Sequence, residues 1–236
     1  MRSLAFLTAA VVALLAAPLA AQEVVYDDQV VVVDDGANPT GSGSERFVSA
    51  GDVQSIRGDI PRGVAAFGPF RVLDASRAAM VDVTDAGSPL AFQAMMRAFP
   101  GIAMIEMVDC PGTEDDLANL RLGRLIRASG ITTYVPPGGS VRSGGVEIFL
   151  AGARRMAAPQ AEFAVHAWMD DTGHEANDYA ASDPENAKYI AYYEAMGMTA
   201  DQARGFYAMT NSVPHAQALW LTGIDMARWV ALDDTA

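Results

Sequence analysis

Ser143 and His166 are the two side chains whose types and surroundings best suit nucleophilic chemistry. Ser143 lies near the end of the glycine-rich stretch PPGGSVRSGG at 136–145, directly before the apolar segment VEIFLAGA. A serine at such a helix start exposes its Oγ beside backbone N–H groups, and a neutral histidine can take its proton. His166 lies in the apolar segment AVHAW. Taken singly, each also has a plain structural interpretation, Ser143 as a helix N-cap and His166 as a hydrogen-bonded core residue.

The turn Asp-Cys-Pro-Gly-Thr at 109–113 offers a second set of groups suited to acyl transfer. We expect Thr113 to cap a helix that starts at Asp115, with Asp116 as the acid of a capping box. The backbone N–H groups around Gly112 and Thr113 would then be placed to receive an oxyanion. A well-capped helix behind a turn would explain the same residues without any chemistry.

Alternating strands and helices position these residues. The apolar pattern predicts strands at 70–73, 78–84, 102–108, 131–135 and 161–168. Helices are predicted at 88–98 (with Ser88 as N-cap), 115–129, 144–153, 186–197 and 199–209. This alternation predicts an α/β fold with a mostly parallel sheet flanked by helices, followed by a C-terminal helical part.

The N-terminus has the pattern of a secretory signal peptide over residues 1–21. Arg2 is followed by an apolar run at 4–17, a proline and small residues suited to cleavage. The run is shorter than the roughly 20 residues that a membrane span needs. We therefore expect a periplasmic or secreted protein with no stable membrane anchor after the signal is cleaved.

Two further regions follow the signal peptide. Residues 22–67 combine a strand-like stretch, VVYDDQVVVV at 24–33, with a Gly/Ser/Pro linker that we expect to be flexible. Residues 68–236 are expected to form the α/β domain. The chain of 236 residues is long enough for this domain to bury its own core.

Charge and cysteine content exclude several classes of function. The chain carries 16 Lys and Arg against 29 Asp and Glu, a formal net charge of −13, which would repel a nucleic acid. The single cysteine, Cys110, excludes an intrachain disulfide and a cysteine-based zinc site. The ligand-rich stretch from His166 to Glu175 matches no common metal motif, so we expect no metal and no cofactor.

From about Phe70 to Trp229 the sequence resembles the Clp protease/crotonase (ClpP-like) superfamily, in particular its exported bacterial branch. The resemblance rests on pieces that occur in the family's order. They are AMVDVTDAGSPLAFQAMMRAFPGIAMIEMVDCPGT, DLANLRLGRLIRASGITTYVP, SVRSGGVEIFLAGARR, AEFAVHAW, YIAYYEAMGMTADQARGFYAM and LWLTGIDMARWV, the last two resembling the family's C-terminal helices.

The resemblance implies a role for each residue that matches the family's motifs. Ser143 corresponds to the nucleophile and His166 to the general base. The backbone N–H groups of Thr113 and Gly144 correspond to the oxyanion hole, with Gly112 shaping its turn. The implied reaction is acyl transfer through an acyl-enzyme that water releases.

The chain departs from the family pattern at several positions. The turn reads Cys-Pro-Gly-Thr where the family has Ser-Pro-Gly-Gly, and Glu147 lies one helical turn beyond Ser143. That carboxylate would be either a hydrogen-bonding partner or a charge unfavourable to an anionic intermediate. The family's third triad member, an Asp, has no clear counterpart. Asn211, Asp170 and Asp171 are the candidates for this orienting role.

Two functions follow from these observations and stay open at this stage. The first is an exported serine hydrolase, most simply a peptidase acting on a peptide or protein substrate. The second is a catalytically inactive relative that serves as a periplasmic binding or assembly scaffold. An acyl-CoA enzyme of the crotonase type is disfavoured because coenzyme A is not expected outside the cytoplasm. Superfamily members commonly assemble, so a homo-oligomer is compatible with either function.

Overall fold

The computed structural model describes residues 46–47 and 60–233. The predicted signal peptide at 1–21 and the predicted strand at 24–33 lie outside the described residues. Within the described residues, no helix combines the length and the apolar character that crossing a membrane requires.

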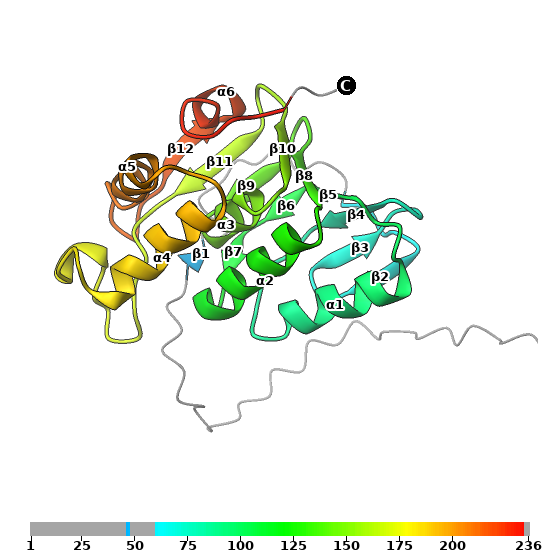
Figure 1. The fold of residues 1–236 in the computed structure, drawn as a ribbon, viewed down its shortest axis with the longest axis horizontal. Helices are drawn as coiled ribbons and strands as arrows, with labels where there is room; N and C mark the ends of the chain where they lie inside the picture. The colour runs from blue at the N-terminus through cyan, green and yellow to red at the C-terminus, as the bar shows by residue number, and fades with distance from the viewer. Residues whose placement is uncertain (1–45, 48–59, 234–236) are drawn as a thin grey trace, which may run out of the picture. The chain divides into compact units, whose positions relative to one another are not determined.

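The protein has an α/β fold with two mostly parallel sheets flanked by helices (Figure 1). The larger sheet has six strands in the order β10-β8-β5-β4-β3-β2. Its strands are β2 (Ala65–Phe67), β3 (Phe70–Val72), β4 (Arg77–Met80), β5 (Met104–Met107), β8 (Thr132–Val135) and β10 (Arg154–Ala157). The strands from β4 to β10 run parallel, and β2 and β3 extend the sheet antiparallel.

The smaller sheet has four strands in the order β12-β11-β9-β6. They are β6 (Asp109–Cys110), β9 (Ser140–Arg142), β11 (Glu162–Val165) and β12 (Leu219–Thr222). The pairs β6–β9 and β9–β11 are parallel, so these three strands end at the same edge of the sheet. A separate two-stranded pair joins β1 (Arg46–Phe47) to β7 (Gly112–Thr113).

The helices pack on these sheets and on one another. They are α1 (Ser88–Ala98), α2 (Asp116–Ala128), α3 (Gly144–Leu150), α4 (Pro184–Ala195), α5 (Ala200–Thr210) and α6 (Gly223–Met226), with a 3₁₀ turn, η2, at Ala176–Asp178. In Figure 1, α1 and α2 lie side by side beside the larger sheet, while α4 and α5 lie beside the smaller one. All seven residues of α3 are buried, so this helix is part of the core.

Most predicted elements are confirmed to within a few residues, and α1 has the predicted bounds. Several details differ. The N-cap of α1 is Gly87, because the Ser88 hydroxyl instead donates to Asp85. Helix α3 ends at Leu150, and Arg154 and Arg155 begin a strand. The segment LWLT, which the family resemblance implies to be helical, is strand β12. Strand β2 precedes residue 68, where we expect the domain to begin, and belongs to the larger sheet.

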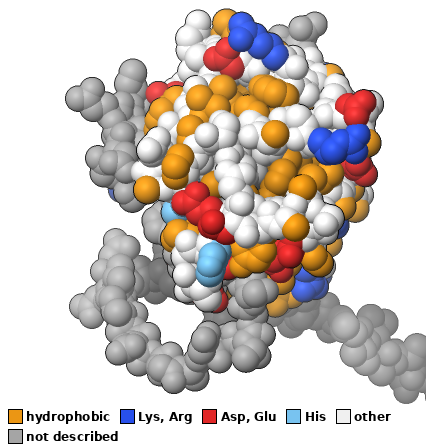
Figure 2. Space-filling view, turned by 90° about the vertical axis from the view of Figure 1, so that its left-hand side faces the viewer, with side chains coloured by type: hydrophobic (Ala, Val, Ile, Leu, Met, Phe, Trp, Pro, Cys, Tyr) orange, Lys and Arg blue, Asp and Glu red, His pale blue; other side chains and the backbone are white. Residues whose placement is uncertain are grey.

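Charges are spread over the surface shown in Figure 2, where acidic and basic side chains lie next to one another at the top and at the right-hand side, with apolar and uncharged side chains between these groups. Trp220 on the edge strand β12 is 41% exposed. Trp229 packs edge-on against Phe206 of α5, with their ring centroids 5.9 Å apart.

Candidate active site

Ser143 occupies a strained turn between β9 and α3. Its φ of 49° and ψ of −123° make it the one non-glycine residue with a positive φ among the described residues. Its backbone is fixed from both sides, because its N–H donates to the carbonyl of Ala164 (2.7 Å) and its carbonyl accepts from Val146 (2.9 Å). A serine pays a conformational cost for this backbone, and such strain is concentrated at functional sites.

The hydroxyl of Ser143 is buried and has no hydrogen-bond partner among the described residues. Ser143 is the N-cap residue of α3, but its side chain caps no backbone N–H. The N-cap interpretation therefore does not explain the hydroxyl. A buried polar group left without a partner costs free energy, and such groups need a reason other than stability.

Gly144 lets the Ser143 turn approach the Cys-Pro-Gly-Thr turn closely. A Cβ at position 144 would lie 2.5 Å from Thr113 Cγ2 and 3.1 Å from the Thr113 backbone nitrogen. The two residues predicted to supply oxyanion donors are therefore neighbours in space. Gly112 has a φ of 139°, a backbone conformation that a side chain would strain, which explains the glycine in this turn.

Thr113 does not cap α2 as the sequence predicts. Asp115 is the N-cap, and its carboxylate accepts from the backbone N–H of Ala118 (2.9 Å). The Thr113 hydroxyl lies 3.0 Å from the carbonyl of Asp115 and 3.2 Å from that of Thr84, and it accepts from the Asp115 N–H. Aspartate competes well for an N-cap position, so the hydroxyl is used instead to hold the turn. Thr113 itself is fully buried.

His166 directly follows β11, which pairs with β9, the strand that leads to Ser143. It is fully buried. The last pair of the β9–β11 register joins Arg142 to Ala164, so Ser143 and His166 both lie just beyond the carboxyl ends of adjacent parallel strands. The Nδ1 atom of His166 lies 2.8 Å from the carbonyl oxygen of Ala167. A proton on Nδ1 would be held there, which leaves Nε2 to carry the lone pair that a general base uses.

His215 packs against His166, a contact that the sequence does not predict. The two rings meet edge to face with centroids 4.6 Å apart, and His215 Nδ1 lies 3.1 Å from the same Ala167 carbonyl. Glu175 fixes the backbone of His215 by accepting from its N–H (2.9 Å). No sequence motif marks this contact, because it joins a loop residue to a strand end 49 positions away.

The three candidate orienting residues have other surroundings. Asn211 donates from its amide to the carbonyl of Tyr207 (2.7 Å), and its Oδ1 has no partner among the described residues. Asp170 accepts from the hydroxyls of Tyr179 and Thr172, and Asp171 is exposed. These contacts place no carboxylate or amide of the three candidates against His166. The group at its Nδ1 is a backbone carbonyl.

The Asp170 carboxylate accepts hydrogen bonds from several residues of its own loop. Partial burial acts to raise its pKa, but hydrogen bonds from Tyr179, Thr172 and the His174 N–H outweigh it and hold the pKa well below its usual value. The same contact raises the pKa of Tyr179 to about 12. Among the described residues, no group of three His, Cys, Asp or Glu side chains is arranged to hold a metal ion.

Glu147 is a buried hydrogen-bonding partner within the core. Its Oε1 accepts from the hydroxyl of Tyr193 (2.7 Å), and its backbone carbonyl accepts from the hydroxyl of Tyr192 (2.7 Å). Both tyrosines belong to α4, so this contact ties α3 to α4. Of the two roles considered for this carboxylate, the structure supports the local partner.

A buried ion pair supports the strand that leads to Ser143. Arg142, 4% exposed at its side chain, donates to Asp109 of β6 (2.8 Å) and to the hydroxyl of Ser140 (2.8 Å). Breaking such a pair would leave a buried charge. This role was not predicted from the sequence, although an arginine beside the candidate nucleophile was the available signal.

Cys110 lies in the turn beside these residues and is fully buried. Burial, together with the nearby Asp109 charge, raises the pKa of its thiol far above the usual range. Its Sγ lies 3.6 Å from the carbonyl of Met80. Cys110 is therefore a protonated core residue in the native protein.

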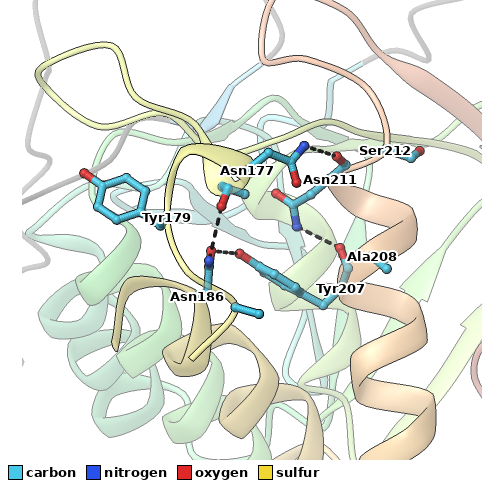
Figure 3. Close-up of a pocket in the computed structure, with 9 residues that line it drawn as sticks. Asn177, Tyr179, Asn186, Tyr207, Ala208, Asn211 and Ser212 are labelled. Carbon is cyan, nitrogen blue, oxygen red and sulfur yellow. Dashed lines mark hydrogen bonds between the residues drawn. The ribbon is translucent and has the colours of Figure 1, made fainter. Parts of the chain in front are cut away.

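A cavity of about 420 Å³ lies between η2, α4 and α5 (Figure 3). Asn211 and Asn177 line it, with the Asn177 amide near the Asn211 carbonyl (3.5 Å). Below them the hydroxyl of Tyr207 donates to Asn186. The side chains of Asn177, Asn211 and Ser212 donate to backbone carbonyls.

No protein-family model matches the chain, and no curated protein matches it. Among solved structures, the chain is similar to 1510-N, a membrane protease specific for a stomatin homolog from Pyrococcus horikoshii, with 19% identity and a TM-score of 0.45. The match covers 66% of this chain and 69% of that one.

Two variants of 1510-N, described as a membrane-bound stomatin-specific protease, are similar to the same degree. One carries a lysine-to-alanine change and is in complex with a substrate peptide, with 20% identity, a TM-score of 0.43 and coverage of 67% and 74%. The other carries a serine-to-alanine change, with 19% identity, a TM-score of 0.44 and coverage of 67% and 78%.

Proposed function

We propose that this protein is an exported serine hydrolase, most simply a peptidase, with Ser143 as nucleophile and His166 as general base. The observation that carries the proposal is the Ser143 turn. A strained serine backbone and a buried hydroxyl with no hydrogen-bond partner in the described part of the chain occur at one residue, between a strand and a helix. Strand-to-helix turns of this kind are how several hydrolase folds present a nucleophile.

The neighbouring groups support each step of acyl transfer. His166 Nε2 accepts the Ser143 proton as Oγ attacks a carbonyl carbon, after rotation of the serine side chain brings Oγ to the imidazole. The N–H groups of Thr113 and Gly144 stabilise the oxyanion that forms. His166 then gives the proton to the leaving amine, and water attacks the acyl-enzyme in the same way. The Ala167 carbonyl takes the orienting position that a carboxylate fills in a full triad.

The test is labelling of the folded, full-length protein with a fluorophosphonate probe. We expect labelling of the wild type and its loss in Ser143→Ala and His166→Ala. Ser140→Ala is the matched control, because Ser140 is also buried, lies three residues earlier, at the start of β9, and has a hydrogen-bonded hydroxyl. Labelling that persists in Ser143→Ala, or that is absent from a folded wild type, contradicts the proposal and favours a binding or assembly protein.

A further inference from the structure

Strand β7 has neighbours on both sides, and their arrangement shows which way its backbone groups point. On one side, Thr84 forms a parallel bridge with Thr113. The Thr84 N–H donates to the Gly112 carbonyl (3.0 Å), and the Thr84 carbonyl accepts from Glu114 (2.8 Å). Along an extended strand, successive peptide groups alternate in direction. The N–H and the carbonyl of Thr113 itself therefore face the opposite side.

Strand β1 lies on that opposite side. It pairs antiparallel with β7, with Arg46 opposite Thr113 and Phe47 opposite Gly112. The backbone of Arg46 is thus the group set against the Thr113 N–H, the donor that the proposed mechanism assigns to the oxyanion. Gly144, the second proposed donor, is adjacent to Thr113 as described above.

We propose that β1 is a built-in occupant of the peptide-binding edge of this site. The proposal rests on the proposed function: the ligand is an extended peptide that adds a strand to β7. In this chain, residues 46–47 fill that place. An extended chain added to an exposed edge binds through its backbone, so the occupant and a substrate peptide need the same N–H and carbonyl groups. They therefore exclude each other.

The covalent connection makes the occupant a strong competitor. A tethered strand acts at an effective concentration in the millimolar range, far above that of a free peptide. The apparent affinity for an external peptide is the intrinsic affinity multiplied by the fraction of molecules in which the edge is open, so it falls as that fraction falls. The native protein is thus closed most of the time, and release of β1 raises the fraction of molecules in which the site is open.

The test uses full-length variants that differ in one backbone group. Arg46→Pro removes the Arg46 N–H and fixes its φ, which disfavours pairing with β7. Arg46→Ala removes the same side chain and keeps the N–H, so it is the matched control. Phe47→Gly, which lowers strand propensity without removing an N–H, applies the same change in a milder form. Thermal unfolding establishes that each variant is folded.

Two readouts do not depend on catalysis. Amide hydrogen exchange at Thr113 is expected to accelerate about tenfold or more in Arg46→Pro and less in Phe47→Gly, and to stay at the wild-type rate in Arg46→Ala. A fluorescent peptide with the sequence SGSERFVSAG is expected to bind Arg46→Pro, in the Ser143→Ala background, about tenfold or more tightly than Arg46→Ala. Equal exchange or equal peptide affinity across the variants overturns the proposal.

Fluorophosphonate labelling separates this inference from the proposed function. If hydrogen exchange and peptide binding change as expected but the fluorophosphonate labels no variant, the occupant is supported and the hydrolase is contradicted. Labelling that depends on Ser143 but is equal in all Arg46 and Phe47 variants, with unchanged exchange, supports the hydrolase and contradicts the occupant.

Discussion

The two ends of helix α3 are built in opposite ways. At its C-terminal end, side chains satisfy the carbonyls that a helix leaves open, with Thr133 donating to Phe149 (2.7 Å), Arg155 to Leu150 (2.8 Å) and Arg127 to Gly152. At its N-terminal end, Ser143 has a strained backbone and a buried hydroxyl with no partner among the described residues. The C-terminal end of α3 is stabilised by these hydrogen bonds, whereas the N-terminal end is strained at the residue where the proposed chemistry takes place.

The largest expected effect comes from adding one methyl group at the N-terminal end. Gly144→Ala places a Cβ against Thr113, so the two proposed oxyanion donors are pushed apart. Loss of such a donor costs about 10²–10³ in rate, and we expect fluorophosphonate labelling to slow by that order. Adding Thr113→Gly to this variant removes the clashing side chain and is expected to restore part of the rate. Labelling of Gly144→Ala within about threefold of wild type would contradict this role.

The same methyl group at the C-terminal end should affect stability instead. In Gly152→Ala the new Cβ would lie 2.2 Å from the Thr133 hydroxyl and 2.4 Å from the Arg154 carbonyl. Overpacking of this kind lowers the free energy of unfolding by about 1–3 kcal/mol, which chemical denaturation measures. Labelling below the transition should stay at the wild-type rate. Gly205→Ala is the control, because its nearest contact is Trp229 at an ordinary 3.6 Å, and a loss of stability there would show that the assay does not report packing.

A smaller effect is expected in the middle of the helix. Tyr193→Phe removes the hydroxyl that donates to the buried Glu147 carboxylate, and we expect a loss of about 1–2 kcal/mol in unfolding free energy. A double-mutant cycle with Glu147→Gln measures the coupling between the two side chains. Strict additivity of the two changes would mean that the contact contributes nothing.

The smallest effect lies outside the helix, in the Asp170 loop. Hydrogen bonds lower the pKa of Asp170 in the folded protein, so its charged form stabilises the fold above the unfolded pKa of about 3.9, and this contribution is lost as the pH falls through the folded value. Asp170→Asn should lower the melting temperature by about 2–4 °C at pH 7. The difference from wild type should shrink below about pH 4. Asp171→Asn, at an exposed neighbour, should show neither change.

The local sequence pattern predicted the helices and strands more accurately than it predicted the contacts of the site. Helix α1 has the predicted bounds because its apolar period and Pro89 are local signals. Strand β9 was hidden in a glycine-rich stretch, since three residues are too few for a period to be visible. LWLT became a strand because its backbone pairs with β11, a contact that its own residues do not encode.

For the site, residue type and order predicted that Ser143 would precede a helix and that His166 would lie in the strand at 161–168, and parallel pairing places both just beyond one sheet edge. The partners of these residues could not be predicted in the same way. The carbonyl of Ala167, the ring of His215 and the buried Arg142–Asp109 pair depend on contacts between segments distant in the chain. A backbone carbonyl in particular has no sequence signature at all.

The burial of Cys110 makes it a chemical reporter of unfolding. Alkylating reagents attack the thiolate, and in the native protein this sulfur is both protonated and out of contact with solvent. Since the chain has a single cysteine, the rate at which iodoacetamide modifies it measures how often the turn beside Thr113 opens, without any introduced label. The same burial means that two native molecules cannot become linked through a disulfide until both of them have opened.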